Sequence, residues 1–470
     1  MTLCFAEQKR IKRNAVRLDR KLKIRAILFA LFIWLSLMSL YPPALVLVAV
    51  VAILIDRAFL VPLMFTIPVI EGGYLIPFPI PPETLLMLFV SPIVALDVIF
   101  TEKNSLNVDK RTIQFYLGNL AVVVFGTFTA IYNLEFGRGS AAEIIGRNIV
   151  IVLQINFFLF LYMNFCKMGV DSIRRGLLML QYMAAPLIFG IYVYLMVHGV
   201  SWGWEGYLNF GSTSHGTWTA TLVGFSAYVF FNLMKKGSYW WNRIVPAAVV
   251  GLTTWIVVET TSRNGIISVI IMFFLSLFLF RGLKFSFQRA AVTLGVIVAL
   301  TFFVIDGWDR DFSVGIRESF NAKSLDDLST GRTSLWKAGL QGFLERPLTG
   351  HGGHFLISRQ YAERTVGIDN VIHNSFLETL FQYGVIGLFL YVYVQLTIFF
   401  GFFKIRKMIS TKPMELDGVF LVPFLTYFTL LFSTLFVSWM WRTVVWYHTS
   451  LILAILTLND LWLKNQRKKT

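Results

Sequence analysis

Residues 347–354 read PLTGHGGH, and residues 373–387 read HNSFLETLFQYGVIG. The first stretch lies in a polar interruption, 307–372, and the second opens the apolar segment that follows it. The interruption holds eight Lys or Arg and eight Asp or Glu, so it is charged but balanced. An apolar helical face within it is formed by Trp336, Leu340, Phe343 and Leu344. We expect a small folded cap on one membrane face, with a chemical site beneath it.

The composition of the whole chain is that of a polytopic membrane protein. Of 470 residues, 56% are hydrophobic and only 14% are charged. The net charge of +16 would suit a nucleic-acid partner, but 30 of the 42 Lys and Arg fall in short segments that share one side of the expected topology. This is the positive-inside bias, with some contact to anionic lipid, and it argues against nucleic acid. Cys4 and Cys166 both fall on the cytoplasmic side and imply no disulfide framework.

The apolar segments predict an all-α fold of about 12–14 transmembrane helices. The expected spans are 24–41, 43–55, 59–70, 83–100, 112–132, 144–165, 176–197, 217–233, 245–258, 265–280, 290–305, 374–403, 419–437 and 444–463. The two short spans around Asp56 and Arg57 form either a tight hairpin or one broken segment, which changes the total by two.

This topology divides the chain into five parts. The parts are a cytoplasmic basic segment at 1–23, spans 1–11 within 24–306, an extracytoplasmic (periplasmic) cap at 307–372, spans 12–14 within 373–463, and a cytoplasmic basic tail at 464–470. Both basic ends lie inside and the cap lies outside.

Three residues stand out on the outer face. Arg263, Arg332 and His373 each follow Ser, Thr, Asp or Asn residues of the kind that cap helix N-termini. A cation at the positive end of a helix dipole is disfavoured by about 0.3–1 kcal/mol. Two arginines placed against that preference make sense if an anion lies between them, and helix N-termini with guanidinium groups suit a phosphate or pyrophosphate.

The histidine indicates a different role. Beside a helix N-terminus the imidazolium is penalised, so His373 is expected to stay neutral and able to accept a proton. Close to a pyrophosphate ester, such a ring suggests a general base for an attacking hydroxyl.

Each of these residues also has a structural interpretation. Arg263 could be an interfacial anchor that reaches lipid phosphates. Arg332 could pair with Asp326 or Asp327 in a surface ion pair. His373 could simply stabilise the start of a helix.

Other motifs carry weaker signals. His351 and His354 could form a metal pair, but no third ligand lies nearby in the sequence. The DRD at 309–311 matches the D-x-D pattern of metal-dependent glycosyltransferases, a three-residue match that occurs often by chance. Gly384 and Gly387 would allow close helix packing.

The order of these motifs resembles the O-antigen ligase and Wzy-type polymerase superfamily. The resemblance covers about 240–390, and the first half of the chain is similar only in general hydropathy. The motifs are Ser262-Arg263-Asn264-Gly265, then Gly331-Arg332 with Trp336, then Pro347-Leu348-Thr349-Gly350, then His373-Asn374 followed after nine residues by Gly384 and Gly387.

The resemblance implies a metal-independent, cofactor-free inverting glycosyltransferase of GT-C-like fold. It would act at the outer (periplasmic) face of the bacterial cytoplasmic (inner) membrane, on sugars carried by undecaprenyl pyrophosphate. Carried over residue by residue, it places Arg263 and Arg332 on the donor pyrophosphate and His373 on the acceptor hydroxyl. Further substrate-binding or supporting residues would be Asn374, Glu378 and Trp336.

The implied partners follow from that activity. They are a lipid-linked oligosaccharide donor, a glycan or lipid A-core acceptor, membrane lipids and a chain-length-regulating membrane protein. A polymerase is favoured over a ligase, because polymerases serve many surface polysaccharides and the cytoplasmic basic ends here are long. The alternative of another class is a lipid or polysaccharide transporter, but ionisable residues within the spans are too few to mark a conduction path.

Overall fold

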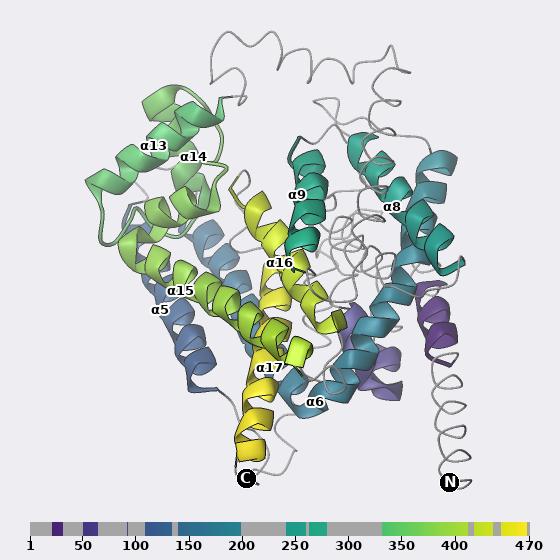
Figure 1. The fold of residues 1–470 in the computed structure, drawn as a ribbon. Helices are drawn as coiled ribbons and strands as arrows, with labels where there is room; N and C mark the ends of the chain where they lie inside the picture. Colours follow the sequence, from purple (N-terminus) through teal and green to yellow (C-terminus); the bar gives the residue numbers. More distant parts are fainter. Residues whose placement is uncertain are drawn as a thin grey trace, which may run out of the picture.

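The computed structural model is all-helical over the residues that it describes, and no strand occurs in those ranges (Figure 1). The described residues are 21–31, 50–63, 92, 109–133, 140–198, 241–259, 263–279, 331–411, 418–435 and 443–467. The named elements are η1 (Arg57–Phe59), α5 (Lys110–Tyr132), α6 (Ala141–His198), α8 (Trp241–Glu259), α9 (Arg263–Leu279), α13 (Arg332–Glu345), α14 (Phe355–Val366), α15 (Ser375–Thr411), η3 (Gly418–Leu421), α16 (Val422–Ser433) and α17 (Thr443–Arg467).

Three of these helices are long and apolar enough to cross a membrane, which confirms the expected polytopic all-α class. They are Lys110–Tyr132, Ala141–Gly190 and Ser375–Ser410, with shorter apolar helices at Ile267–Leu279 and Gly418–Ser433. The observed α5, α8, α9, α16 and α17 coincide with spans expected at 112–132, 245–258, 265–280, 419–437 and 444–463. The spans expected at 83–100, 217–233 and 290–305, and the D-x-D match, lie outside the described residues. The total of 12–14 spans stays a prediction.

The chain breaks its longest helices at glycines. In α6, Gly169 has φ 74 and ψ 172, outside the helical region, and it lies between the two spans expected at 144–165 and 176–197. In α15, Gly384 has φ 63 and ψ −161. The span expected at 374–403 is present within α15, and Gly384 breaks it after the first nine residues of the helix.

A further break occurs at Asp56, between the two short spans expected there. The Asp56 carboxylate accepts a hydrogen bond from Ala58 N at 3.0 Å and so caps η1. The same carboxylate lies 3.6 Å from Arg25 and 3.9 Å from Arg175. The turn at Asp56 is therefore tied to basic residues of two neighbouring helices.

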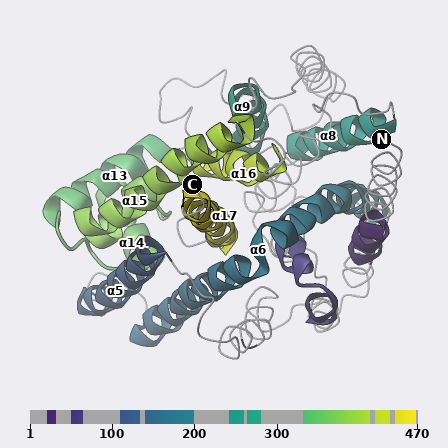
Figure 2. The same cartoon turned by 60° about the horizontal axis from the view of Figure 1, so that its bottom comes forward.

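The bundle is arranged around α17, which packs against α6, α15 and α16. Seen from below, α17 is viewed nearly end-on between those helices (Figure 2). A hydrogen bond of 2.9 Å joins the hydroxyls of Tyr162 on α6 and Thr457 on α17, and the rings of Phe157 and Tyr447 meet edge to face at 5.6 Å. Among the described helices, α17 thus lies at the centre.

The cap is formed by α13 and α14, which lie together at the upper left of Figure 1, above α5 and α15. Its core contains residues from the cap and from the bundle. They are Ala130, Ile144, Leu335, Ala338, Ile357, Tyr361, Ala362, Ile372 and Phe381. Because Ala130, Ile144 and Phe381 belong to α5, α6 and α15, the cap is continuous with the membrane helices.

The helix expected around Trp336, Leu340, Phe343 and Leu344 is present as α13, but its apolar face is only partly buried. The residues that α13 buries are Leu335, Ala338, Gly339 and Gly342, whereas Leu340 is 47% exposed and Leu344 is 67% exposed. A methyl group on Gly342 would lie 2.5 Å from the ring of Phe381, so the small residues allow α13 to approach α15 closely.

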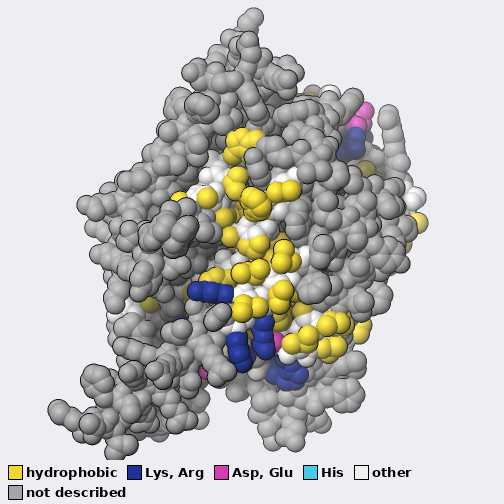
Figure 3. All heavy atoms as spheres, turned by 90° about the vertical axis from the view of Figure 1, so that its right-hand side faces the viewer, with side chains coloured by type: hydrophobic (Ala, Val, Ile, Leu, Met, Phe, Trp, Pro, Cys, Tyr) yellow, Lys and Arg dark blue, Asp and Glu magenta, His cyan; other side chains and the backbone are white. Residues whose placement is uncertain are grey.

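On the right-hand face, the described hydrophobic side chains form a vertical band, and most of the described Lys and Arg that are visible lie at its lower end (Figure 3). The sidedness expected from the positive-inside bias stays a prediction.

Candidate functional site

The glycine-rich turn at 350–353 fixes the cap to two membrane helices. Gly350 and Gly352 have φ values of 67 and 114, in the region that favours glycine. Three backbone hydrogen bonds hold the turn: His351 N to Phe381 O at 2.8 Å, Gly352 N to Gln382 O at 3.0 Å and Gly353 N to Gly126 O at 2.9 Å. A side chain on Gly352 would come within 2.4 Å of the Ala130 backbone, so the turn needs glycine both for its conformation and for space.

His351 and His354, at the glycine-rich turn, both bind backbone atoms of the cap. His351 Nε2 lies 2.8 Å from Gly342 O, and its ring stacks on Phe381 at 4.6 Å. His354 Nδ1 accepts a hydrogen bond from Leu356 N at the start of α14. Burial lowers the pKa of His351 and lowers the pKa of His354 to about 4.

The metal-pair interpretation of His351 and His354 gains no support from these contacts. The His351 ring binds the backbone of α13, and the His354 ring binds the backbone at the start of α14. Within the described ranges, no group of three His, Cys, Asp or Glu side chains lies close enough to hold an ion.

Glu378 is a buried carboxylate that joins three segments of the cap. Its Oε1 accepts hydrogen bonds of 2.6 Å from Ser358 of α14 and from Gln382 of α15, and its Oε2 accepts one of 3.2 Å from Ile372 N. Hydrogen bonds to a carboxylate are stronger than neutral ones. Glu378 therefore fixes the backbone immediately before His373.

The first turn of α15 is capped by Asn374. Its Oδ1 accepts from Phe376 N at 3.0 Å and from Leu377 N at 3.1 Å. Ser375 N donates to Thr434 O at 2.9 Å, which ties the start of α15 to the end of α16. The expectation that His373 itself opens this helix is therefore wrong, because the helix begins at Ser375 with Asn374 as its cap.

His373 has a strained backbone. Its φ is 54, and it is the one non-glycine residue with a positive φ in the described ranges. Such a conformation costs about 1–3 kcal/mol, is tolerated better by His and Asn than by most residues, and is found most often at functional sites. The ring is partly exposed on the cap.

Asn370 contacts the ring of His373 and defines its tautomer. Val371 N donates to Asn370 Oδ1 at 2.9 Å, so the atom at that position must be the amide oxygen. His373 Nε2 lies 3.1 Å from the same oxygen. Since an amide oxygen only accepts, Nε2 must be the donor, and the lone pair of the neutral ring lies on Nδ1. The sequence showed Asn370 only as a capping residue.

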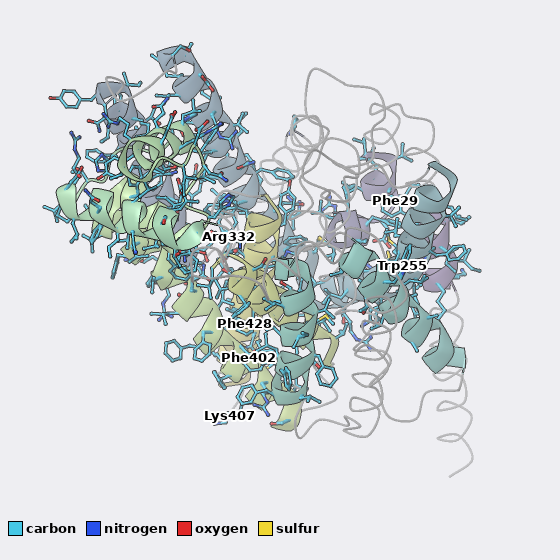
Figure 4. All side chains as sticks on the ribbon, turned by 90° about the horizontal axis from the view of Figure 1, so that it is seen from above. Phe29, Trp255, Arg332, Phe402, Lys407 and Phe428 are labelled. Carbon is cyan, nitrogen blue, oxygen red and sulfur yellow. The ribbon has the colours of Figure 1, made fainter. Side chains whose placement is uncertain are left out.

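Arg332 begins α13, as predicted, but its capping differs from the expectation. The N-cap is Gly331, in the left-handed conformation with φ 78, and no side chain caps the helix. Side chains on Gly331 and Gly339 would lie 3.3 Å from Ile368 and 2.9 Å from Ile372, so α13 runs along the loop that leads to His373. Figure 4, seen from above, shows Arg332 on the side of the cap turned toward α16 and α9.

Arg263 begins α9, as predicted. Its side chain lies outside the described part of the structure, as do Asp326 and Asp327, the alternative partners of Arg332. Figure 1 shows that α8 ends and α9 begins at the top of the bundle, on the side of the cap. Helix α9 packs along α16, and the residue after α16, Thr434, accepts a hydrogen bond from Ser375 at the start of α15. That Arg263, Arg332 and His373 form one site stays a prediction.

Trp336 lies within the cap. Its ring packs against the cap core, together with Ile368 and Leu377. Its expected role in substrate binding stays a prediction.

The comparisons with known proteins agree with the motifs. Residues 247–392 match the O-antigen ligase family. Over 121 residues, the chain is 31% identical to a protein of Rhizobium meliloti (strain 1021) called "Exopolysaccharide production protein ExoQ", a match that covers 23% of this chain and 27% of that relative. The resemblance of this region to the O-antigen ligase and polymerase superfamily is confirmed.

Proposed function

We propose that this protein is a membrane glycosyltransferase of surface polysaccharide assembly, and that it joins glycan units carried on a lipid pyrophosphate. The observation that supports this most is the strained His373, which Asn370 contacts directly and whose preceding residue, Ile372, is held by Glu378 and packs against Gly339 of α13. We infer that Arg332, at the start of the same helix, supplies the cation that an anionic leaving group needs. The match at 247–392 includes all these residues.

The chemistry needs few groups. A pyrophosphate is already a good leaving group, so the site has to stabilise the negative charge that grows on it, which is the role given to Arg332 and Arg263. Nδ1 of His373 would remove the proton of the acceptor hydroxyl as the new glycosidic bond forms. Attack from the face of the sugar opposite the leaving group inverts the anomeric carbon. The arginines must therefore lie behind the pyrophosphate and His373 beyond the opposite face.

Polymerase is our first candidate, and ligase is the second. The Rhizobium relative is named for exopolysaccharide production, which favours joining of glycan to glycan. The matching family is described as O-antigen ligase, which favours transfer to lipid A-core. The outer face of the bacterial inner membrane, undecaprenyl pyrophosphate as the carrier and a GT-C-like fold complete the proposal.

Reconstitution in liposomes tests this proposal. The purified protein would receive undecaprenyl-pyrophosphate-linked oligosaccharide, with and without lipid A-core, and products would be separated by size. Longer glycans without lipid A-core indicate a polymerase, and glycan found only on lipid A-core indicates a ligase. Movement of the glycan lipid across the bilayer without any transfer would contradict the enzyme and support a transporter. Activity is expected to survive EDTA.

The contact between Asn370 and His373 gives a pH prediction. The charged groups on the residues next to this contact are Glu378, which binds Ile372 N, and the paired Arg359 and Asp369. In Asn370→Asp, a carboxylate would keep both hydrogen bonds and favour the imidazolium. We expect the rising limb of the rate–pH profile to move to higher pH by roughly 1–2 units.

A control separates this effect from loosening of the loop. Asp369→Asn removes the carboxylate that pairs with Arg359 from the same loop and adds no negative charge beside His373, so it should produce no upward shift. Rates should be compared above about pH 6.5, the ordinary pKa of histidine. Burial lowers the pKa of His354 to about 4, so the unfolded chain takes up a proton before the folded cap does, and the cap loses stability as the pH falls from about 6.5 toward 4. An unchanged limb in Asn370→Asp would remove Asn370 from the role of positioning His373.

A further inference from the structure

Three exposed leucines lie on the outer face of α13 and in the turn that follows it. Leu340 and Leu344 are about one helical turn apart, and Leu348 comes three residues after the helix ends at Glu345; they are 47%, 67% and 65% exposed. We call these three residues the leucine row. The opposite face of the helix fills the cap core. Apolar side chains exposed to water leave hydrophobic stabilisation unused. Isolated exposed leucines are normal, but three of them close together beside a membrane helix favour an apolar partner.

The leucine row continues onto a membrane-crossing surface. Val385 N donates to Pro347 O at 2.8 Å, and a side chain on Gly384 would lie 2.3 Å from Leu348 O, so the end of α13 rests on α15 where that helix breaks. Figure 1 shows the lower end of α13 beside the upper left end of α15.

From that contact onward, α15 exposes apolar side chains along one side. They are Val385 at 44%, Ile386 at 54%, Phe389 at 67%, Leu396 at 48%, Phe400 at 65% and Phe403 at 40%. Because Ser375–Ser410 is long and apolar enough to cross a membrane, this side of α15 is the one that lipid chains cover. The leucine row therefore begins where the lipid-facing surface of α15 ends.

The polar residues of α13 fit the same position. Lys337, Gln341 and Glu345 are exposed on the helix that carries the leucine row. A helix with an apolar strip and a mixed polar flank lies in the interface between lipid and water, and a lysine there can extend its amine to the phosphate layer.

We propose that α13 is an interfacial helix, whose leucine row is inserted among the acyl chains of the outer leaflet. The bilayer then supports the cap from below, in addition to the glycine turn at 350–353. On the function proposed above, this placement also brings the Arg332 end of α13 to headgroup level, where the pyrophosphate of a lipid-linked donor lies.

Spin labelling of the full-length protein in liposomes tests the insertion. A nitroxide would be placed at Leu344→Cys, with Gln341→Cys on the same helix as a matched control, after Cys4 and Cys166 have been replaced by Ala. At 344 we expect frequent collisions with oxygen, which dissolves in lipid, and few with a water-soluble nickel chelate. At 341 we expect the opposite, with frequent collisions with the nickel chelate and few with oxygen.

Two outcomes would overturn the proposal. If the label at 344 meets the nickel chelate as often as the label at 341, the leucine row faces water. If the label at 344 is protected from both reagents, a protein surface covers the leucines instead of acyl chains. Neither measurement depends on turnover, so a failed insertion and a failed glycosyltransferase assay are distinguishable.

Discussion

Replacing His373 by Asn is expected to slow glycan transfer by about 10²–10⁴-fold at saturating donor, with little change in donor binding. The variant removes the proton acceptor and leaves the arginines and the pyrophosphate contacts in place. Asn is the replacement of choice because it tolerates the left-handed backbone of residue 373, whereas Ala would add strain. Single-turnover rates and a separate binding assay with the lipid-linked donor would measure the two effects.

A second histidine of the cap serves as a matched control. His351→Gln disturbs the stacking on Phe381 and the contact with Gly342 O, so it should lower thermal stability and leave the chemical step of the folded protein largely unchanged. The opposite result for His373→Asn, weaker donor binding with a normal rate at saturation, would make His373 a ligand of the pyrophosphate and place the base elsewhere.

Replacing Arg332 by Ala is expected to reduce both donor binding and rate, because a guanidinium on the pyrophosphate acts in the ground state and in the transition state. Loss of one charged donor at a developing anion costs about 2.7–4 kcal/mol, or about 10²–10³-fold in rate. Arg332→Lys should restore little, since lysine keeps the charge but not the planar two-pronged geometry.

The control for Arg332 is Arg364→Ala, which removes one exposed arginine from the last turn of α14, at a different place in the cap. This variant should keep near-native activity. Full activity of Arg332→Ala, in protein shown to be folded and inserted, would remove Arg332 from the site. It would also revive the interpretation that Arg332 forms a surface pair with Asp326 or Asp327.

Composition and the order of the motifs predicted several helices of the fold. Apolar segments of sufficient length identified α5, α9 and α17, and the starts of α9 and α13 were predicted at Arg263 and Arg332. The buried face of α13 was not predictable by the same reasoning. In a membrane protein, leucines can be stable on the outside, so an apolar row does not show which way a helix faces. The small residues Ala338 and Gly339 marked the buried face instead.

The contacts around His373 could not be predicted from the sequence either. Spacing predicted a helix that starts at residue 373, because a capping residue is recognised by its type and Asp369 and Asn370 come just before it. The structure shows that Asn374 caps the helix, while Asn370 contacts the His373 ring and His373 has a positive φ. The contact of Glu378 with Ile372 joins residues six apart, and residue type and spacing alone do not predict it.

The shared core of the cap has a consequence for how new specificity could arise in this superfamily. Ile357 and Tyr361 of α14 pack together with Ala130, Ile144 and Phe381, which lie in three membrane helices. A peptide of 307–372 alone would expose one side of that core and would not be expected to fold. For the same reason, exchanging only the outer loop between two relatives would pack the loop against membrane helices whose side chains do not fit it. Chimeras that recognise a different glycan should succeed when the outer ends of α5, α6 and α15 are exchanged with the loop.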